Sequence, residues 1–156
     1  MTDMYLSVSL EAKHDFDTDA VTRRLGVEPT QIRKLGTPMH PGHDALYKYS
    51  SWEWDTGHIS ADDAGELIAQ AAAMFQSRAT VMRELADEYG GKWAIVLDGY
   101  VHSGDAPTVL LPPDFVEFCA AISAIFQYVI DISYDYASKG GADRGTAEDR
   151  PDIHRG

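Results

Sequence analysis

The residues best placed to hold a metal ion lie in a short segment rich in histidine. His40 and His43 are three residues apart, Asp44 follows directly, and His58 is the next histidine along the chain. Imidazole and carboxylate groups are common ligands of Zn²⁺. A proline and a glycine separate the first two histidines, however, and the sequence has neither a cysteine pair nor an HExxH helix. We therefore expect ordinary loop histidines, with no metal and no other cofactor.

Nucleophilic catalysis has one candidate thiol, the single cysteine Cys119. It falls on the apolar stripe of an expected helix, where a thiol is normally buried and inert, and its sequence neighbours supply no base to activate it. The sequence also lacks a GxSxG elbow and a glycine-rich phosphate loop. We predict no catalytic residue, and an enzyme is the less favoured interpretation.

Four aromatic residues fall close together and could form a ligand site: Tyr47, Tyr49, Trp52 and Trp54. The two tryptophans are two residues apart, so they share one face of a regular strand. In one interpretation the indoles close the hydrophobic core. In the other, they join the tyrosines and the loop histidines in binding a small ligand or in a weak enzyme. Both interpretations stay open at this stage.

Negative charge is the strongest feature of the composition, and it is unevenly distributed. The chain has 13 Lys and Arg against 25 Asp and Glu, a formal net charge of −12. Residues 49–136 hold three basic and 14 acidic side chains, whereas residues 1–48 and 137–156 are close to neutral. Nucleic-acid binding requires clustered Lys and Arg, so no nucleic acid is expected as a partner. The charge favours a basic protein partner, or serves solubility alone.

Length and composition predict one domain followed by a flexible C-terminal tail. At 156 residues and 17.2 kDa the chain fits a single core. Residues 138–156 are rich in Gly, Asp and Arg, so we expect an α+β domain over residues 1–137 and a flexible tail over residues 138–156. The lone cysteine and the lack of a signal peptide or a membrane-spanning apolar run predict a cytoplasmic protein without membrane contact.

Alternation of apolar and polar residues predicts strands with one buried face and one solvent-exposed face. Residues 4–11, 93–102 and 128–136 alternate in this way, and residues 46–56 favour a strand pair or one bent strand.

Apolar residues at helical spacing predict three helices. The first is about two turns long and ends at Gly26. The second runs from a segment resembling a capping box at residues 60–63 to Gly90. Unbroken, it would measure about 45 Å, so we expect a bend near residues 76–78. The third opens at a proline pair and keeps its apolar stripe as far as Phe126.

These elements predict a two-layer α+β sandwich, with a mostly antiparallel sheet of about five strands and about three helices packed on one face. If the strands are neighbours, their polar positions share the uncovered face and form an acidic docking surface for a basic protein. The residues that we predict to contact the partner are Glu53, Asp55, Asp98, His102, Asp131 and Asp135.

Several short motifs, in a fixed order, resemble a known family. The segment 25–30 (LGVEPT) follows the first helix, Gly36 and the Trp52 strand come next, and residues 111–113 (LPP) open the last helix. Together they resemble the bacterial domain-of-unknown-function family DUF4279 over roughly residues 4–136. The resemblance implies the fold and a bacterial or phage context. It implies no activity, cofactor or catalytic residue.

Three functions are therefore compatible with the sequence. We favour a non-enzymatic binding protein, such as an immunity protein, an antitoxin or an anti-defence inhibitor, that presents the acidic sheet face to a basic partner. The first alternative is a small-ligand domain or weak enzyme built on the four aromatic residues. The second is a homo-oligomeric structural module that pairs through its open face or a sheet edge. The sequence does not fix the oligomeric state.

Overall fold

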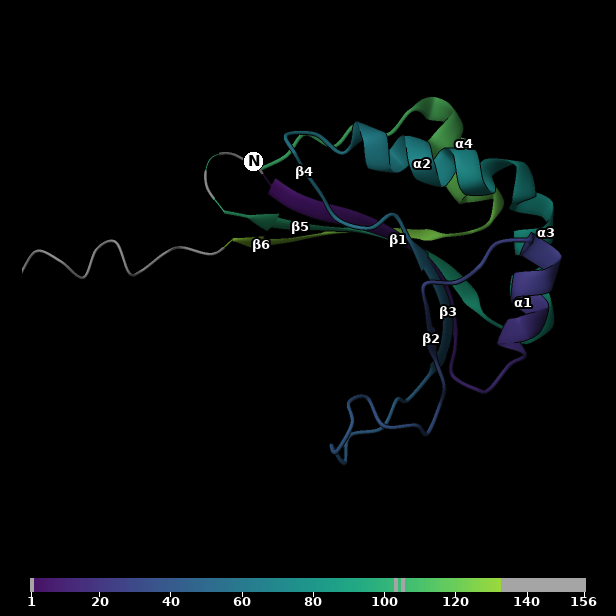
Figure 1. Ribbon diagram of the computed structural model, residues 1–156. Helices are drawn as coiled ribbons and strands as arrows, with labels where there is room; N and C mark the ends of the chain where they lie inside the picture. Colours follow the sequence, from purple (N-terminus) through teal and green to yellow (C-terminus); the bar gives the residue numbers. More distant parts are fainter. Residues whose placement is uncertain (1, 103, 105, 133–156) are drawn as a thin grey trace, which may run out of the picture.

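The structure, a computed structural model, describes residues 2–102, 104 and 106–132, and it confirms the predicted two-layer α+β sandwich (Figure 1). The helices cover one face of a single sheet. The elements in chain order are β1 (Thr2–Ala12), α1 (Thr18–Leu25), β2 (Gln31–Arg33), β3 (Ser50–Asp55), β4 (Ile59–Ala61), α2 (Gly65–Phe75), the 3₁₀ turn η1 (Gln76–Arg78), α3 (Ala79–Tyr89), β5 (Lys92–Val101), α4 (Pro113–Ala121) and β6 (Ile125–Ile132).

Strand β1 lies at the centre of the sheet. The strand order is β2-β3-β1-β5-β6, and β4 pairs with β1 beyond the end of β3. Among these strands, each pairing is antiparallel except that of β5 with β6, which is parallel. The described sheet has six strands, close to the predicted number, and β4, which is three residues long, is too short to show a periodic pattern in the sequence.

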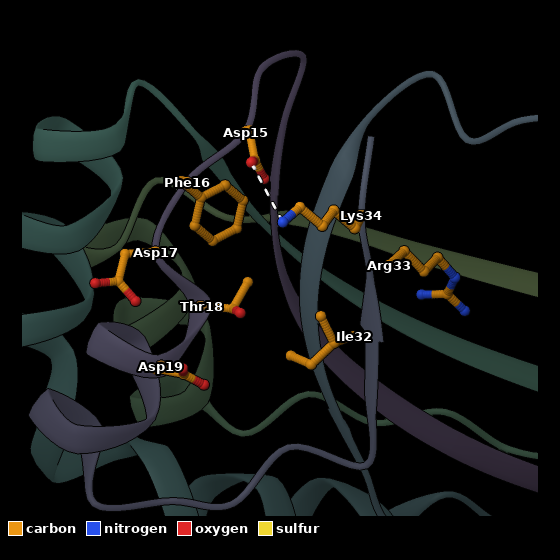
Figure 2. A pocket seen from close by; sticks show the side chains of 8 residues that line it. All are labelled: Asp15, Phe16, Asp17, Thr18, Asp19, Ile32, Arg33 and Lys34. Atoms are coloured by element: carbon orange, nitrogen blue, oxygen red, sulfur yellow. Dashed lines mark ion pairs between the residues drawn. The ribbon is translucent and has the colours of Figure 1, made fainter. Parts of the chain in front are cut away.

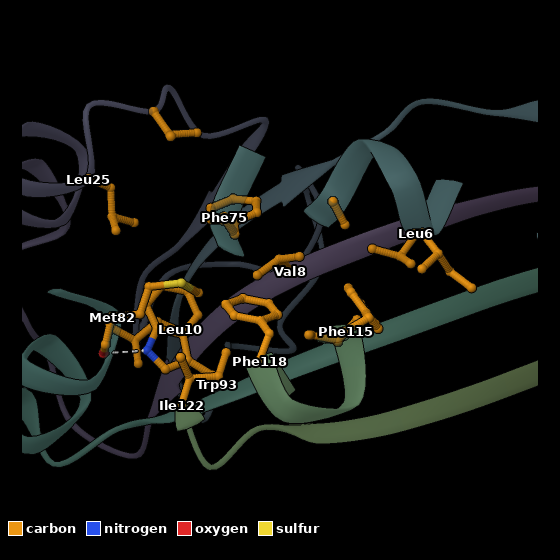
Figure 3. Packing of buried hydrophobic residues seen from close by; sticks show 14 of the residues in the cluster. Leu6, Val8, Leu10, Leu25, Phe75, Met82, Trp93, Phe115, Phe118 and Ile122 are labelled. Carbon is orange, nitrogen blue, oxygen red and sulfur yellow. Dashed lines mark hydrogen bonds between the residues drawn. The ribbon is translucent and has the colours of Figure 1, made fainter. Parts of the chain in front are cut away.

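The hydrophobic core lies between the helices and one face of the sheet (Figure 3). In β1 the alternate residues Met4, Leu6, Val8 and Leu10 are at most 1% exposed, as a strand covered on one face requires. Leu10 lies opposite Trp93 of β5, and helix residues such as Phe75, Met82 and Phe118 surround these strand residues. The main helix residues in the core are Val21, Leu25, Leu67, Phe75, Met82, Leu85, Phe115 and Phe118.

Both tryptophans of β3 lie on the helix-covered face. Trp52 is fully buried and contacts Phe75 and Trp93 edge-on, with ring centroids 6.4 and 6.1 Å away. Its indole Nε1 donates a hydrogen bond to Thr22 Oγ1 at 3.0 Å, so the polar atom of this buried ring is satisfied. Trp54 is partly buried against the same phenylalanine. The structure therefore matches the core interpretation of the tryptophans.

The predicted bend in the second helix is confirmed at residues 76–78, where η1 separates α2 from α3. Arg78 enters the apolar stripe here, and its guanidinium donates to the backbone oxygens of Leu25 and Met74. The predicted end of the first helix is also confirmed, since Gly26 adopts a left-handed conformation with φ 67°.

The predicted start of the second helix is wrong. Residues 60–63 do not form a capping box, because Ser60 and Ala61 belong to β4 and pair with β1. The helix begins at Gly65 instead. The Gly65 N–H donates a hydrogen bond to Asp63 Oδ1 at 2.9 Å. Sheet pairing thus competes successfully with local capping preference.

The predicted end of the third helix is also wrong, because α4 stops at Ala121 and Phe126 belongs to β6. The Ala124 N–H donates to Cys119 O at 2.9 Å, and the Ser123 N–H to Ala120 O at 3.0 Å. These two bonds form a Schellman motif, with Ser123 left-handed at φ 51° where glycine is usual.

Within the described residues, no helix combines the length and apolar character that crossing a membrane requires. The tail predicted for residues 138–156 lies outside the described residues.

Thr22→Val should destabilise the fold by about 1–3 kcal/mol, because the buried indole N–H of Trp52 would lose its acceptor while the shape at position 22 stays the same. Thr22→Ser keeps the hydroxyl and should cost less. Denaturant unfolding of both variants measures the difference in the free energy of unfolding. A valine variant as stable as wild type would show that the hydrogen bond from Trp52 to Thr22 does not stabilise the fold.

Ser123→Gly should stabilise the protein by about 0.5–1 kcal/mol, because glycine adopts the left-handed conformation at the end of α4 without strain. The exposed hydrogen bond from Arg83 to the serine hydroxyl is lost, at small cost. Ser123→Ala is the matched control, since it removes the hydroxyl but keeps Cβ. If alanine stabilised as much as glycine in thermal unfolding, strain would not be the cause.

Candidate functional site

The face of the sheet opposite the helices carries the polar residues of the alternating strands. The register places Ser9 of β1 between Glu53 of β3 and Ala94 of β5, and Ser7 between Asp55 and Val96. Both serines are nearly buried, at 3% and 6% exposed, although no described helix covers this face. Two carboxylates, Glu53 and Asp55, are therefore their direct neighbours on β3.

One end of this face forms a small cavity, the acidic hollow, with a volume of about 190 Å³. Two rows of the sheet build it. In the first row Asp3, Tyr100 and Asp131 are neighbours across β1, β5 and β6, and in the second Tyr5 lies opposite Asp98. The residues that line the hollow are Asp3, Tyr5, His58, Asp98, Gly99, Tyr100 and Asp131.

Tyr5 is held as a neutral hydrogen-bond donor inside the hollow. Burial, with a smaller contribution from its hydrogen bond to Asp98, raises the pKa of Tyr5 to about 12. The ring also contacts His58, with centroids 4.6 Å apart. Tyr5 therefore orients the Asp98 carboxylate and, because it stays protonated near neutral pH, is unsuited to act as a base.

Negative charge remains available in the hollow. His102 Nε2 lies 2.7 Å from Asp3 Oδ2, and this hydrogen bond, followed by one from Ser60, lowers the pKa of the Asp3 carboxyl. Within the described part of the chain, neither Asp98 nor Asp131 forms a salt bridge with Lys or Arg. The arrangement can accept a cation from outside the chain.

The structure divides the six residues predicted to contact a partner. Asp98 and Asp131 line the hollow, and His102 adjoins it through Asp3. Asp135 lies outside the described residues.

The remaining two predicted contacts, on β3, already have partners within the chain. Glu53 Oε2 pairs with Arg33 Nη1 at 2.7 Å, and both side chains are less than one-fifth exposed. Asp55 accepts hydrogen bonds from Thr30 Oγ1 at 3.0 Å and from the Gly57 N–H at 2.8 Å. These two carboxylates hold the β2–β3 pairing and the following turn together.

Sequence reasoning predicted two of the hollow's seven lining residues as contacts and missed the other five, of which Gly99 and Tyr100 lie in the predicted strand 93–102. Tyr5 lies at a polar position of the alternating segment 4–11, so the pattern could have identified it. Asp3 precedes that segment, and His58 stands in a loop, so only the tertiary structure brings them to the site.

The four aromatic residues of the alternative ligand site do not form one cluster. Tyr47 and Tyr49 contact each other, with ring centroids 6.1 Å apart, whereas Trp52 and Trp54 face the core. Tyr49 lines a different cavity, of about 520 Å³, at the end of the sheet near Glu11, Lys92 and Ile125.

A further cavity, of about 460 Å³, lies between the start of α1 and β2 (Figure 2). Local contacts occupy several of its charged groups. Lys34 Nζ lies 3.8 Å from Asp15 Oδ2, and Asp17 caps α1 by accepting a hydrogen bond from Ala20. Arg33 points away from the cavity toward the β3 carboxylate described above. This cavity therefore offers little free charge to a ligand.

The groups considered for metal binding and nucleophilic catalysis lie elsewhere. His40 and His43 are exposed in the loop before β3. Among the described residues, no three His, Cys, Asp or Glu side chains are grouped closely enough to hold a metal ion. Burial raises the pKa of the Cys119 thiol, which opposes formation of a thiolate.

Comparison with known proteins gives a family but no activity. No curated protein and no solved structure matches the chain. A family model described as "Domain of unknown function (DUF4279)" matches residues 2–133, which includes every described strand and helix. This span also contains the LGVEPT segment and the LPP segment before α4. The chain belongs to the DUF4279 family of domains of unknown function.

Proposed function

We propose that this protein is a non-enzymatic binding protein that holds a basic protein partner against the uncovered face of its sheet, as an immunity protein, an antitoxin or an anti-defence inhibitor would. The acidic hollow is the observation that supports the proposal. Asp98 and Asp131 lie diagonally across from each other on β5 and β6 and line the same hollow, and within the described chain neither forms a salt bridge with Lys or Arg. A cationic side chain would supply the missing charge.

The size of the hollow suits one side chain better than a free ligand. Its 190 Å³ lies below the roughly 300–1,000 Å³ typical of small-molecule sites. Tyr5 and Tyr100 add aromatic surface beside the carboxylates, which favours a guanidinium or ammonium group through cation–π contact. We infer that an Arg or Lys of the partner enters here.

The charge of the whole chain would assist the encounter. A net charge of −12 attracts a basic protein over a distance, and the hollow then provides a specific contact. We place this interaction in the cytoplasm, because a single cysteine offers no disulfide within the chain.

The double variant Asp98→Asn and Asp131→Asn should weaken binding of a short arginine-rich peptide by about tenfold or more at low salt, because two carboxylates near the cation are neutralised. Asparagine keeps a side-chain oxygen that can accept the hydrogen bond from Tyr5. Isothermal titration calorimetry at low and high salt measures the effect.

The matched control is the double variant Glu66→Gln and Glu117→Gln, which removes the same net charge from exposed positions on α2 and α4. It should weaken binding less than about threefold, since distant surface charges are largely screened. Equal losses in the two double variants would mean that only net charge attracts the peptide. No loss in the Asp98 and Asp131 variant would remove the hollow as the docking site.

A small-ligand function is the second candidate, and the cavity beside Tyr49 is its supporting observation. Its 520 Å³ falls within the usual range for small molecules, and it combines the apolar Ile125 and Trp93 with the charged Glu11 and Lys92. A fragment screen by NMR tests it, with shifts expected at Tyr49 and Ile125. Shifts confined to the acidic hollow, or none at all, would reject this candidate.

A further inference from the structure

The two outer edges of the sheet differ sharply in how they are protected. The β2 edge is only three residues long and carries Arg33. The β6 edge is eight residues long, and within the described residues β6 pairs with β5 alone. Its sequence, IFQYVIDI, contains no Pro, Gly or Lys and a single charge, Asp131. Natural proteins normally shield an edge of this kind with charge, proline or a short length.

Exposed apolar side chains follow the same edge. Ile125 is 56% exposed, Tyr128 36% and Ile132 54%, so both ends and the middle of the strand present apolar surface. A strand that joined here would form backbone hydrogen bonds and cover these side chains at once.

We propose that β6 is the pairing edge of a homodimer, in which the β6 strands of two copies join antiparallel and form one continuous sheet. This inference goes beyond the binding function proposed above, and the two surfaces have Asp131 in common, which lines the hollow and lies in β6.

The sequence of β6 is complementary to itself in this arrangement. A twofold axis perpendicular to the sheet at Val129 places Tyr128 opposite Ile130 of the other copy, and Gln127 opposite Asp131. Phe126 then lies opposite Ile132. No two like charges meet across the seam, and the Asp131 carboxylate faces an amide donor.

Charge also favours a second copy at this edge over the basic partner. A basic strand would find only one carboxylate along the whole of β6, whereas an apolar strand such as β6 itself finds matching surface. Two copies of a chain at −12 repel each other, so they can approach closely only where acidic residues are few. The β6 edge meets that condition.

Analytical ultracentrifugation of the full chain should therefore give a concentration-dependent mass that approaches twice 17.2 kDa. Tyr128→Lys should raise the dimer dissociation constant by about tenfold or more, because it brings two ammonium groups to the seam near the axis. Val116→Lys, at an apolar position of α4 that is 48% exposed, is the matched control and should leave the mass unchanged. A wild-type monomer at high concentration, or equal effects of the two lysines, would overturn the proposal.

Crosslinking tests the register in the same molecule. In a Cys119→Ala background, Val129→Cys should be joined to its copy by a short bis-maleimide, because residues opposite each other on antiparallel strands have Cβ atoms only about 5 Å apart. Ile32→Cys on the β2 edge should not be joined. Efficient crosslinking at position 32 and none at 129 would place the interface on the wrong edge and refute the β6 dimer. Circular dichroism confirms that each variant is folded.

Discussion

The position of β1 at the centre of the sheet is the constraint on which the rest of the structure depends. It pairs with β3 and β4 along one edge and with β5 along the other. Because strand side chains alternate, the same segment supplies Leu6 and Leu10 to the core and Asp3 and Tyr5 to the acidic hollow. A shift of one residue in its pairing would exchange these two sets. The register that buries the apolar residues of β1 in the core therefore also determines which polar side chains lie on the opposite face.

The hollow also depends on the single parallel pairing of the described sheet. Parallel neighbours need a long crossover, and here α4 provides it between β5 and β6. Phe115 of α4 packs edge-on against Phe126 of β6, with ring centroids 6.5 Å apart, on the core side. This contact, together with the left-handed turn at Ser123, sets where β6 begins. The register that follows brings Asp131 beside Tyr100, so a packing contact in the core positions a carboxylate on the other face.

The parts of the structure that could be predicted are those that one segment determines by itself. Alternation placed Asp98 and Asp131 on a polar face, and the long apolar stripe interrupted at Arg78 indicated the bend. Which strands are neighbours depends on contacts between distant segments, so the pattern could not show that Arg33 neutralises Glu53. Local rules also failed where tertiary pairing overrode them. The segment 60–63 resembles a capping box, but its first two residues, Ser60 and Ala61, belong to β4, because β1 offers backbone hydrogen-bond partners there.

Local pairing, rather than net charge, determines which carboxylates of this molecule are left without a cationic partner in its described part. Among the acidic residues singled out in the sequence, Glu53 is neutralised by Arg33. Asp55 and Asp98 accept hydrogen bonds from neutral groups, and within the described part of the chain neither Asp98 nor Asp131 forms a salt bridge with Lys or Arg. The two proposals are physically compatible. A twofold axis perpendicular to the sheet at β6 leaves both hollows on the same side of the continuous sheet. A partner with two cationic side chains at a suitable spacing would then bind the dimer with higher affinity than a partner with one, since its second contact forms within the same complex.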